Sequence, residues 1–131
     1  MGTSEIYSAV LSLDEILDAL VIDLPKAPEW ADDAAGRGNG GFMPLFVVLR
    51  EGEELDDELV SQIKRRIRED CSPRHVPDEI RQIAEVPRTL SGKVLEVPVK
   101  RILTGTPADK AASRESLANP EALDYFIEMA G

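Results

Sequence analysis

Two apolar runs in the first half of the chain predict β-strands. Residues 15–24 (EILDALVIDL) form the first run, which Pro25 ends. Residues 43–49 (MPLFVVL) form the second and clearer run. The connection over residues 25–41 is rich in Pro, Asp, Ala and Gly, with a glycine-rich stretch at 36–41. We predict that this connection is a flexible insertion within a hairpin. A phosphate-binding loop is a poorer fit, because no helix start follows the glycines and their neighbours are acidic.

A helical period follows the second strand. Residues 56–70 place apolar side chains on one face at a spacing of four, with basic side chains on the other faces. Asp56 stands where an N-cap is expected, and Pro73 stops the helix. A shorter helix is predicted at the chain start, where Thr3 or Ser4 can cap it. The predicted apolar faces are Leu59, Ile63 and Ile67 in the long helix and Ile6, Val10 and Leu11 in the short one.

The second half of the chain adds one strand and two helices. Residues 79–86 are a strand candidate, although their apolar positions are spaced by three. Residues 95–103 predict a short helix with Pro98 in its first turn. Residues 122–129 predict a last helix, with Asn119 as its N-cap.

These elements predict an α+β fold. The first two strands pair as a hairpin, and the third is reached by a crossover through the central helix. The result is a small three-stranded sheet packed with helices. We expect an α+β domain over residues 1–105, followed by a tether, most clearly residues 106–115, and a C-terminal helix within residues 106–131.

Composition and charge narrow the possible partners. The net charge of −10 argues against a nucleic-acid-binding module. No apolar run approaches a membrane span and no export signal is evident, so we expect no membrane partner and a cytoplasmic protein. The charge is uneven, because residues 64–101 hold ten basic and six acidic residues. Such a segment can attract an anion locally, although a solvated helix face is the commoner explanation.

The chain has one cysteine, Cys71, and one histidine, His75. An intramolecular disulfide and a zinc cluster of Cys and His residues are therefore excluded, and no metal site is expected. A nucleophilic pair of Cys71 and His75 is conceivable. We interpret Cys71 instead as a half-buried small apolar residue at the end of the central helix.

Residues 86–93 (VPRTLSGK) are the centre of the chemistry that the sequence offers. The Ser91-Gly92 pair predicts a tight turn, because glycine adopts positive φ at little cost. Such a turn would hold Lys93 at a loop tip beside the Thr89 and Ser91 hydroxyls, where its ammonium could reach a phosphate or carboxylate. A plain β-turn with a solubilising lysine fits the pattern alone, and a P-loop does not, because Val94 follows the lysine.

Three segments resemble the C-terminal domain of the adenylate-forming superfamily of acyl-CoA synthetases, luciferases and peptide synthetases. Residues 2–6 (GTSEI) resemble the loop with which that domain begins, and residues 88–93 (RTLSGK) resemble its lysine motif. The spacing between them also matches. Within the superfamily, the flanks resemble acetoacetyl-CoA synthetases, most clearly in residues 72–78, 95–101 and 116–121.

The resemblance implies a role for several residues. Lys93 would enter the active site when ATP and the acid form an acyl-adenylate, and the motif residues Thr89, Ser91 and Gly92 would support it. The domain would then rotate so that Gly2 and Thr3 line the pantetheine path. Arg68 would lie near the CoA 3′-phosphate, with Arg65 and Lys64 as substitutes.

The resemblance also implies binding partners, although two positions of the lysine motif differ from the usual residues. The partners would be the protein's own large N-terminal domain, ATP or the acyl-adenylate, and CoA, with Mg²⁺ in the full-length enzyme. A lysine acetyltransferase and deacetylase would act on Lys93, since acetylation removes its charge. Arg88 and Leu90 replace the usual Lys and Arg of the motif, so they need not share the usual roles.

The implied function is that of a mobile domain of an acetoacetate–CoA ligase, which turns acetoacetate, ATP and CoA into acetoacetyl-CoA, AMP and diphosphate. The chain alone is expected to be inactive and to bind none of the cofactors, because the ATP and acid sites lie in the missing domain. The alternative is a free-standing α+β ligand-binding or regulatory module, since 131 residues contain no complete catalytic set.

Overall fold

The computed structural model describes residues 4–25, 42–72 and 76–130. Its centre is a mixed sheet in the order β1 (Ile16–Val21), β2 (Pro44–Leu49) and β3 (Glu79–Gln82). β1 and β2 pair antiparallel, and β2 and β3 pair parallel. The predicted hairpin and crossover are therefore confirmed. The flexible insertion predicted at residues 25–41 lies almost entirely outside the described residues.

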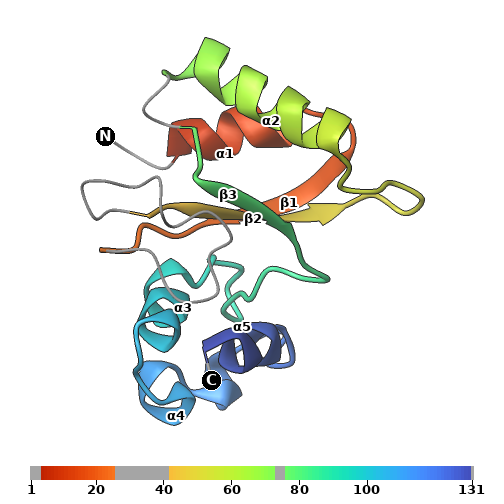
Figure 1. Cartoon of the computed structure of the whole chain (residues 1–131). Helices are drawn as coiled ribbons and strands as arrows, with labels where there is room; N and C mark the ends of the chain where they lie inside the picture. Colours follow the sequence, from red (N-terminus) through yellow and green to blue (C-terminus); the bar gives the residue numbers. More distant parts are fainter. Residues whose placement is uncertain (1–3, 26–41, 73–75, 131) are drawn as a thin grey trace.

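β2 is apolar throughout because it is the central strand. Both faces of the sheet are covered, so alternation between polar and apolar positions gives way to a continuous apolar run. Figure 1 shows α1 and α2 above the sheet and α3, α4 and α5 below it. Two separate apolar clusters fill the two faces.

The upper face is covered by α1 (Ser4–Leu11) and α2 (Asp57–Asp70). The predicted N-cap is confirmed, because the Asp56 carboxylate accepts a hydrogen bond of 2.8 Å from the Leu59 N–H. The predicted apolar stripe of α2 is fully buried against the sheet. In α1 one prediction is wrong: Leu11 is 43% exposed, because it follows Val10 by one position and so lies about 100° around the helix from that buried residue.

The lower face is covered by α3 (Glu96–Leu103), α4 (Ala108–Ala111), the 3₁₀ turn η3 (Arg114–Ser116) and α5 (Ala122–Ala130). Phe126 of α5 packs edge-on against Phe46 of β2, with ring centroids 5.0 Å apart. The prediction of a tether at residues 106–115 is wrong. This segment forms α4 and η3, and Ala111 within it is buried in the same cluster as Phe46.

The third strand is shorter than predicted. Strand pairing ends at Gln82, followed by one further backbone bond from the Ile83 N–H to the Val47 carbonyl. Ile83 and Val86 are buried and the two residues between them are exposed. The spacing of three therefore reflects an irregular segment that leaves the sheet. In the described parts of the chain, no helix is long and apolar enough to cross a membrane.

Candidate functional site: the lysine hairpin

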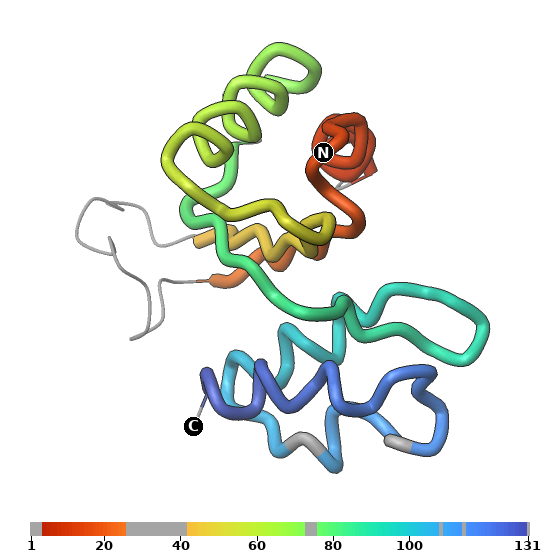
Figure 2. Tube along the Cα trace, turned by 90° about the vertical axis from the view of Figure 1, so that its right-hand side faces the viewer, coloured from red at the N-terminus to blue at the C-terminus, as the bar shows by residue number. Residues whose placement is uncertain are grey.

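The segment between β3 and α3 forms a short hairpin that projects from the body of the molecule, at the right of Figure 2. Arg88 and Val94 face each other as an antiparallel bridge at its base. The Thr89 N–H donates to the Lys93 carbonyl at 2.9 Å, and the Gly92 N–H donates to the Thr89 carbonyl at 2.9 Å. Gly92 has φ +91°, so the turn uses the backbone freedom that the sequence predicted for it.

Lys93 is exposed beside this turn. Its backbone N–H donates to the Thr89 hydroxyl at 3.1 Å, and the Thr89 and Ser91 hydroxyls share a hydrogen bond of 3.0 Å. The two hydroxyls therefore stabilise the turn rather than contact the ammonium. Leu90, at the tip, is 71% exposed. The structure thus presents a charged and an apolar side chain on one small, braced loop.

The half-exposed Arg88 side chain ties the base of the hairpin to the sheet. Its Nη2 lies 2.7 and 2.8 Å from the two carboxylate oxygens of Asp18 in β1, and its Nε lies 3.3 Å from one of them. Its Nη1 donates to the Gly92 carbonyl at 2.8 Å. A single guanidinium therefore joins the sheet to the residue that precedes Lys93.

The tail of the chain braces the same hairpin from the other side. Asn119 accepts a hydrogen bond from the Arg88 N–H at 2.9 Å and donates one to the Val86 carbonyl at 2.9 Å. The Leu90 N–H donates to the Ser116 carbonyl at 3.0 Å. The Asn119 side chain is thus not the cap of α5 that the sequence predicted, because its amide serves residues 86–88 instead.

Sequence reasoning did not identify Asp18 or Asn119 as part of this site. The only signal for Asp18 is a carboxylate inside an otherwise apolar strand pattern, and local sequence does not name its partner 70 residues away. Asn119 precedes a helix, so an N-cap role accounted for an asparagine at this position and gave no reason to connect it with the hairpin. Arg88 was recognised as a motif residue, but its contacts were not foreseen.

The second group of predicted site residues lies elsewhere. Arg68 is exposed in the last turn of α2, which covers the sheet face opposite to α3 and the hairpin. Gly2 and Thr3 lie outside the described residues. Lys93 and Arg68 therefore belong to elements on opposite sides of the sheet and are not brought together in one site.

Tyr7 connects these two sides. Its phenol donates to the Glu96 carboxylate at 2.8 Å and accepts from the Val21 N–H at 3.0 Å. Burial is the main cause that raises the pKa of Tyr7, the Val21 N–H lowers it, and Glu96 raises it further. A neutral phenol thus joins α1, the outer edge of β1 and the start of α3.

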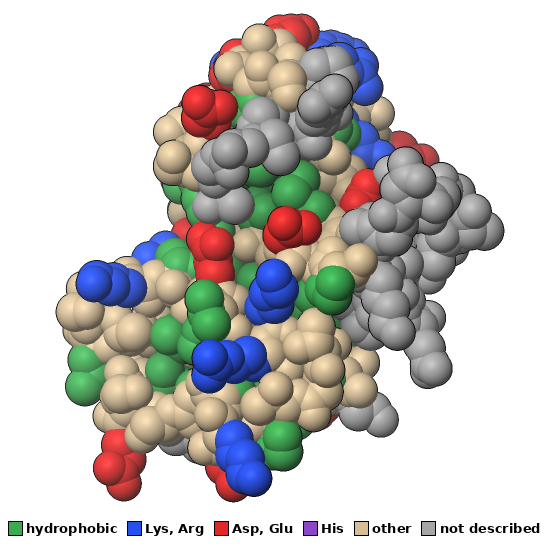
Figure 3. All heavy atoms as spheres, turned by 90° about the vertical axis from the view of Figure 1, so that its left-hand side faces the viewer, with side chains coloured by type: hydrophobic (Ala, Val, Ile, Leu, Met, Phe, Trp, Pro, Cys, Tyr) green, Lys and Arg blue, Asp and Glu red, His purple; other side chains and the backbone are tan. Residues whose placement is uncertain are grey.

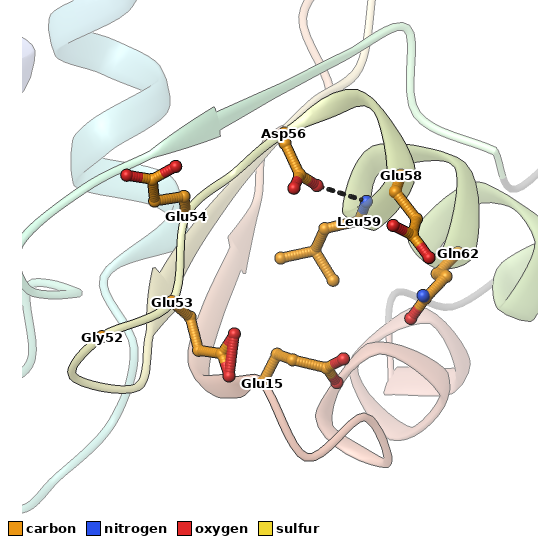
Figure 4. Close-up of a pocket in the computed structure, with 8 residues that line it drawn as sticks. All are labelled: Glu15, Gly52, Glu53, Glu54, Asp56, Glu58, Leu59 and Gln62. Carbon is orange, nitrogen blue, oxygen red and sulfur yellow. Dashed lines mark hydrogen bonds between the residues drawn. The ribbon is translucent and has the colours of Figure 1, made fainter.

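A hollow of about 330 Å³ lies between the start of β1 and the turn that leads into α2 (Figure 4). Its lining is largely acidic: Glu15, Gly52, Glu53, Glu54, Asp56, Glu58, Leu59 and Gln62. This hollow does not suit ATP or CoA, because clustered carboxylates repel phosphates. On the face shown in Figure 3, Lys and Arg side chains are spread among hydrophobic ones over the half built by α3 to α5.

The described residues contain no group of three or more His, Cys, Asp and Glu side chains that could hold a metal ion. Cys71 caps the C-terminus of α2 and is half-buried against the upper cluster, as predicted. Burial, and then Glu5 and Asp70, raise the pKa of its thiol, which is unfavourable for a nucleophile. His75, its conceivable partner, lies outside the described residues.

Comparison with known proteins places these features in a family. No protein-family model matches the chain. An acetoacetyl-coenzyme A synthetase of Rhizobium meliloti is 44% identical over 126 residues, and an acetoacetyl-CoA synthetase of Caenorhabditis elegans is 38% identical over 128 residues. These matches cover 96% and 98% of this chain but 17% of each relative. The chain thus spans about a sixth of the length of these relatives.

Solved structures agree. Acetoacetyl-CoA synthetase from Streptomyces lividans superposes with a TM-score of 0.82 at 45% identity, covering 99% of this chain and 18% of that one. An acyl-CoA synthetase of Brucella canis gives a TM-score of 0.59 at 26% identity, covering 72% of this chain and 16% of that one. The fold is therefore that of the C-terminal domain of adenylate-forming acyl-CoA synthetases. Within that class, nearly the whole chain matches the C-terminal part of acetoacetyl-CoA synthetases.

Proposed function

We propose that the chain is the mobile C-terminal domain of an acetoacetate–CoA ligase, which forms acetoacetyl-CoA, AMP and diphosphate from acetoacetate, ATP and CoA. In this proposal it supplies Lys93 to a larger N-terminal domain. The observation that carries the proposal is an exposed lysine on a braced hairpin, in a chain that matches acetoacetyl-CoA synthetases over nearly its whole length.

Lys93 suits the adenylation half of this reaction. Its ammonium is positively charged at neutral pH and sits on a long flexible stem. Placed between the acetoacetate carboxylate and the α-phosphate, it would orient the attack and offset the charge that develops on the phosphoryl oxygens. The carboxylate oxygen forms the new bond to phosphorus, and diphosphate leaves.

The described residues offer an exposed lysine for a phosphate, whereas the hollow beside α2 is lined largely by carboxylates, which repel a nucleotide. The described part of the chain also provides no group of three or more His, Cys, Asp and Glu side chains that could hold a metal ion. ATP and Mg²⁺ are therefore expected to be held mainly by the N-terminal domain. There ATP would supply the adenylyl group and Mg²⁺ would offset the charge of its phosphates. The chain by itself is expected not to turn over substrate.

The thioester half of the reaction would use the other side of the domain. Gly2 and Thr3 are proposed to line the pantetheine path, and Arg68 to bind the CoA 3′-phosphate. Support comes from the placement of Arg68 on α2, across the sheet from the Lys93 hairpin. A domain that presents its two sides in turn, by rotating between the half-reactions, would be compatible with this placement.

The test uses the ligase that contains this chain, whose existence is checked first by reading the gene upstream of Met1 for a frame with an ATP-binding domain. Lys93→Ala should lower adenylate formation on the order of 10²- to 10³-fold, the loss typical for one transition-state donor. Thioester formation from supplied acetoacetyl-adenylate should remain largely intact. Lys100→Ala, which removes an exposed charge from α3, is the matched control and should leave both halves unchanged.

Equal loss of both half-reactions in Lys93→Ala would reject the assigned role. Lys93→Gln, which mimics the uncharged acetylated side chain, should behave like the alanine variant if acetylation regulates the enzyme through charge. Unchanged activity of fully acetylated enzyme would contradict that part. A chain with no upstream domain that binds a small metabolite would instead favour a free-standing module.

A further inference from the structure

Lys93 is exposed, so packing of its own side chain does not fix its place. What fixes the hairpin is a set of polar contacts at its base. We propose that Asp18, Arg88 and Asn119 are positioning residues, which hold the Lys93 hairpin in the pose that its ammonium needs. This inference rests on the proposed function, and it adds residues from β1 and from the tail to the lysine motif.

The Arg88 guanidinium makes the central connection. It binds both oxygens of Asp18, which lies in a strand of the sheet, and it binds the Gly92 carbonyl, which is directly bonded to the nitrogen of Lys93. The Arg88 and Asp18 side chains are 35% and 25% exposed. Water therefore weakens the pair, but the bidentate geometry fixes an orientation that a single contact would not.

Asn119 holds residues 86–88, the segment that leads into the hairpin. Its side chain uses one donor and one acceptor, on the Val86 carbonyl and the Arg88 N–H. The Ala118 N–H donates to the Arg88 carbonyl at 2.9 Å, and Thr89 and Leu117 form an isolated bridge. The segment around Asn119 thus pairs with the motif residue by residue, so the position of the hairpin depends on the tail.

A pose error matters because the lysine acts at one phosphoryl centre. A misplacement of about 1 Å at a reacting group can cost about 10²-fold in rate. Loss of Arg88 frees one end of a short hairpin rather than unfolding it, since the Thr89, Gly92 and Lys93 backbone bonds remain. We therefore expect Asp18→Ala and Arg88→Ala each to lower the adenylation kcat about tenfold.

The first measurement compares the two half-reactions in the full ligase. Asp18→Ala and Arg88→Ala should slow adenylation with little change in the KM for ATP, while thioester formation from supplied adenylate is retained. The double variant should lose no more than Arg88→Ala alone, because Asp18 acts through Arg88. Arg88→Lys should recover only a small part of the rate, since it keeps the charge opposite Asp18 but lacks the fork that also reaches the Gly92 carbonyl. Glu85→Gln is the matched control, an exposed carboxylate on the same hollow as Asp18 and Arg88.

The second measurement does not depend on catalysis. Amide hydrogen exchange in this chain should become faster at Arg88 in Asn119→Ala, because that N–H loses its acceptor. It should become faster at Gly92 and Lys93 in Arg88→Ala, because the hairpin keeps its own hydrogen bonds but opens more often once the Gly92 carbonyl is no longer held. It should remain unchanged at all three amides in Glu85→Gln.

The two measurements separate the inference from the proposed function. If Lys93→Ala abolishes adenylation but the Asp18 and Arg88 variants leave both rate and exchange unchanged, the positioning role is wrong and the function stands. If the variants lower both half-reactions equally, their role is general stability and the inference is overturned. If exchange changes as expected while Lys93→Ala leaves adenylation intact, the proposed function fails and the brace remains as a structural feature only.

Discussion

Substitution of Phe126 in α5 tests whether the last helix shares one apolar core with the sheet. Its side chain is fully buried, and its ring packs edge-on against Phe46 of β2 at 5.0 Å and Tyr125 at 5.2 Å. Truncation to alanine would leave a cavity between α5 and the central strand. The change therefore probes a contact between the last helix and the middle of the sheet.

The expected loss follows from cavity formation. Phe→Ala at a fully buried site costs about 3–5 kcal/mol, which includes the edge-to-face contacts that the ring makes. Phe126→Leu should cost less, about 1–2 kcal/mol, because leucine refills part of the space. A domain of this size has a free energy of unfolding of about 5–15 kcal/mol, so the alanine variant should lose a large part of it.

Urea unfolding measures this loss, followed by far-ultraviolet circular dichroism and by NMR signals of residues in β2 and α5. Both probes should report one transition that moves together to lower urea. Glu128→Ala, on the exposed side of the same helix, is the control and should shift stability by less than about 0.5 kcal/mol. A loss below about 1 kcal/mol in Phe126→Ala, or a separate early transition of α5, would refute the shared core.

Two further predictions concern α1 and α2. Because burial raises the pKa of Tyr7 above the ordinary tyrosine value of about 10, its contribution to stability should be complete below pH 10 and be lost as the pH rises beyond it. Urea midpoints between pH 8 and 11 should fall more steeply for the wild type than for Tyr7→Phe; parallel curves would contradict this. Asp56→Ala should cost about 1 kcal/mol of unfolding free energy through loss of the N-cap. Asp57→Ala, which removes the neighbouring carboxylate but keeps the cap, is the control and should cost less.

Local sequence patterns determined most of the elements and their order. The stripe of Leu59, Ile63 and Ile67 predicted a helix, and the apolar run of β2 predicted a strand, because each pattern repeats with the period of its own backbone. The Ser91-Gly92 turn was also predictable from local sequence, because glycine readily adopts the positive φ, here +91°, that the turn requires. The family resemblance of the lysine motif likewise needed only adjacent residues.

The tertiary structure decided what depends on distant partners. Residues 106–115 carry a weak local pattern, yet Ala111 is buried because α4 packs against α3 within the lower apolar cluster. Arg88 and Asp18 are 70 residues apart, and Asn119 serves Val86 across 33 residues. A side chain's hydrogen-bonding capacity is fixed by its type, but its partner is fixed by which chain segments the two apolar clusters bring together. The sequence therefore determined the lysine and its turn, and the folded core decided what holds that turn in place.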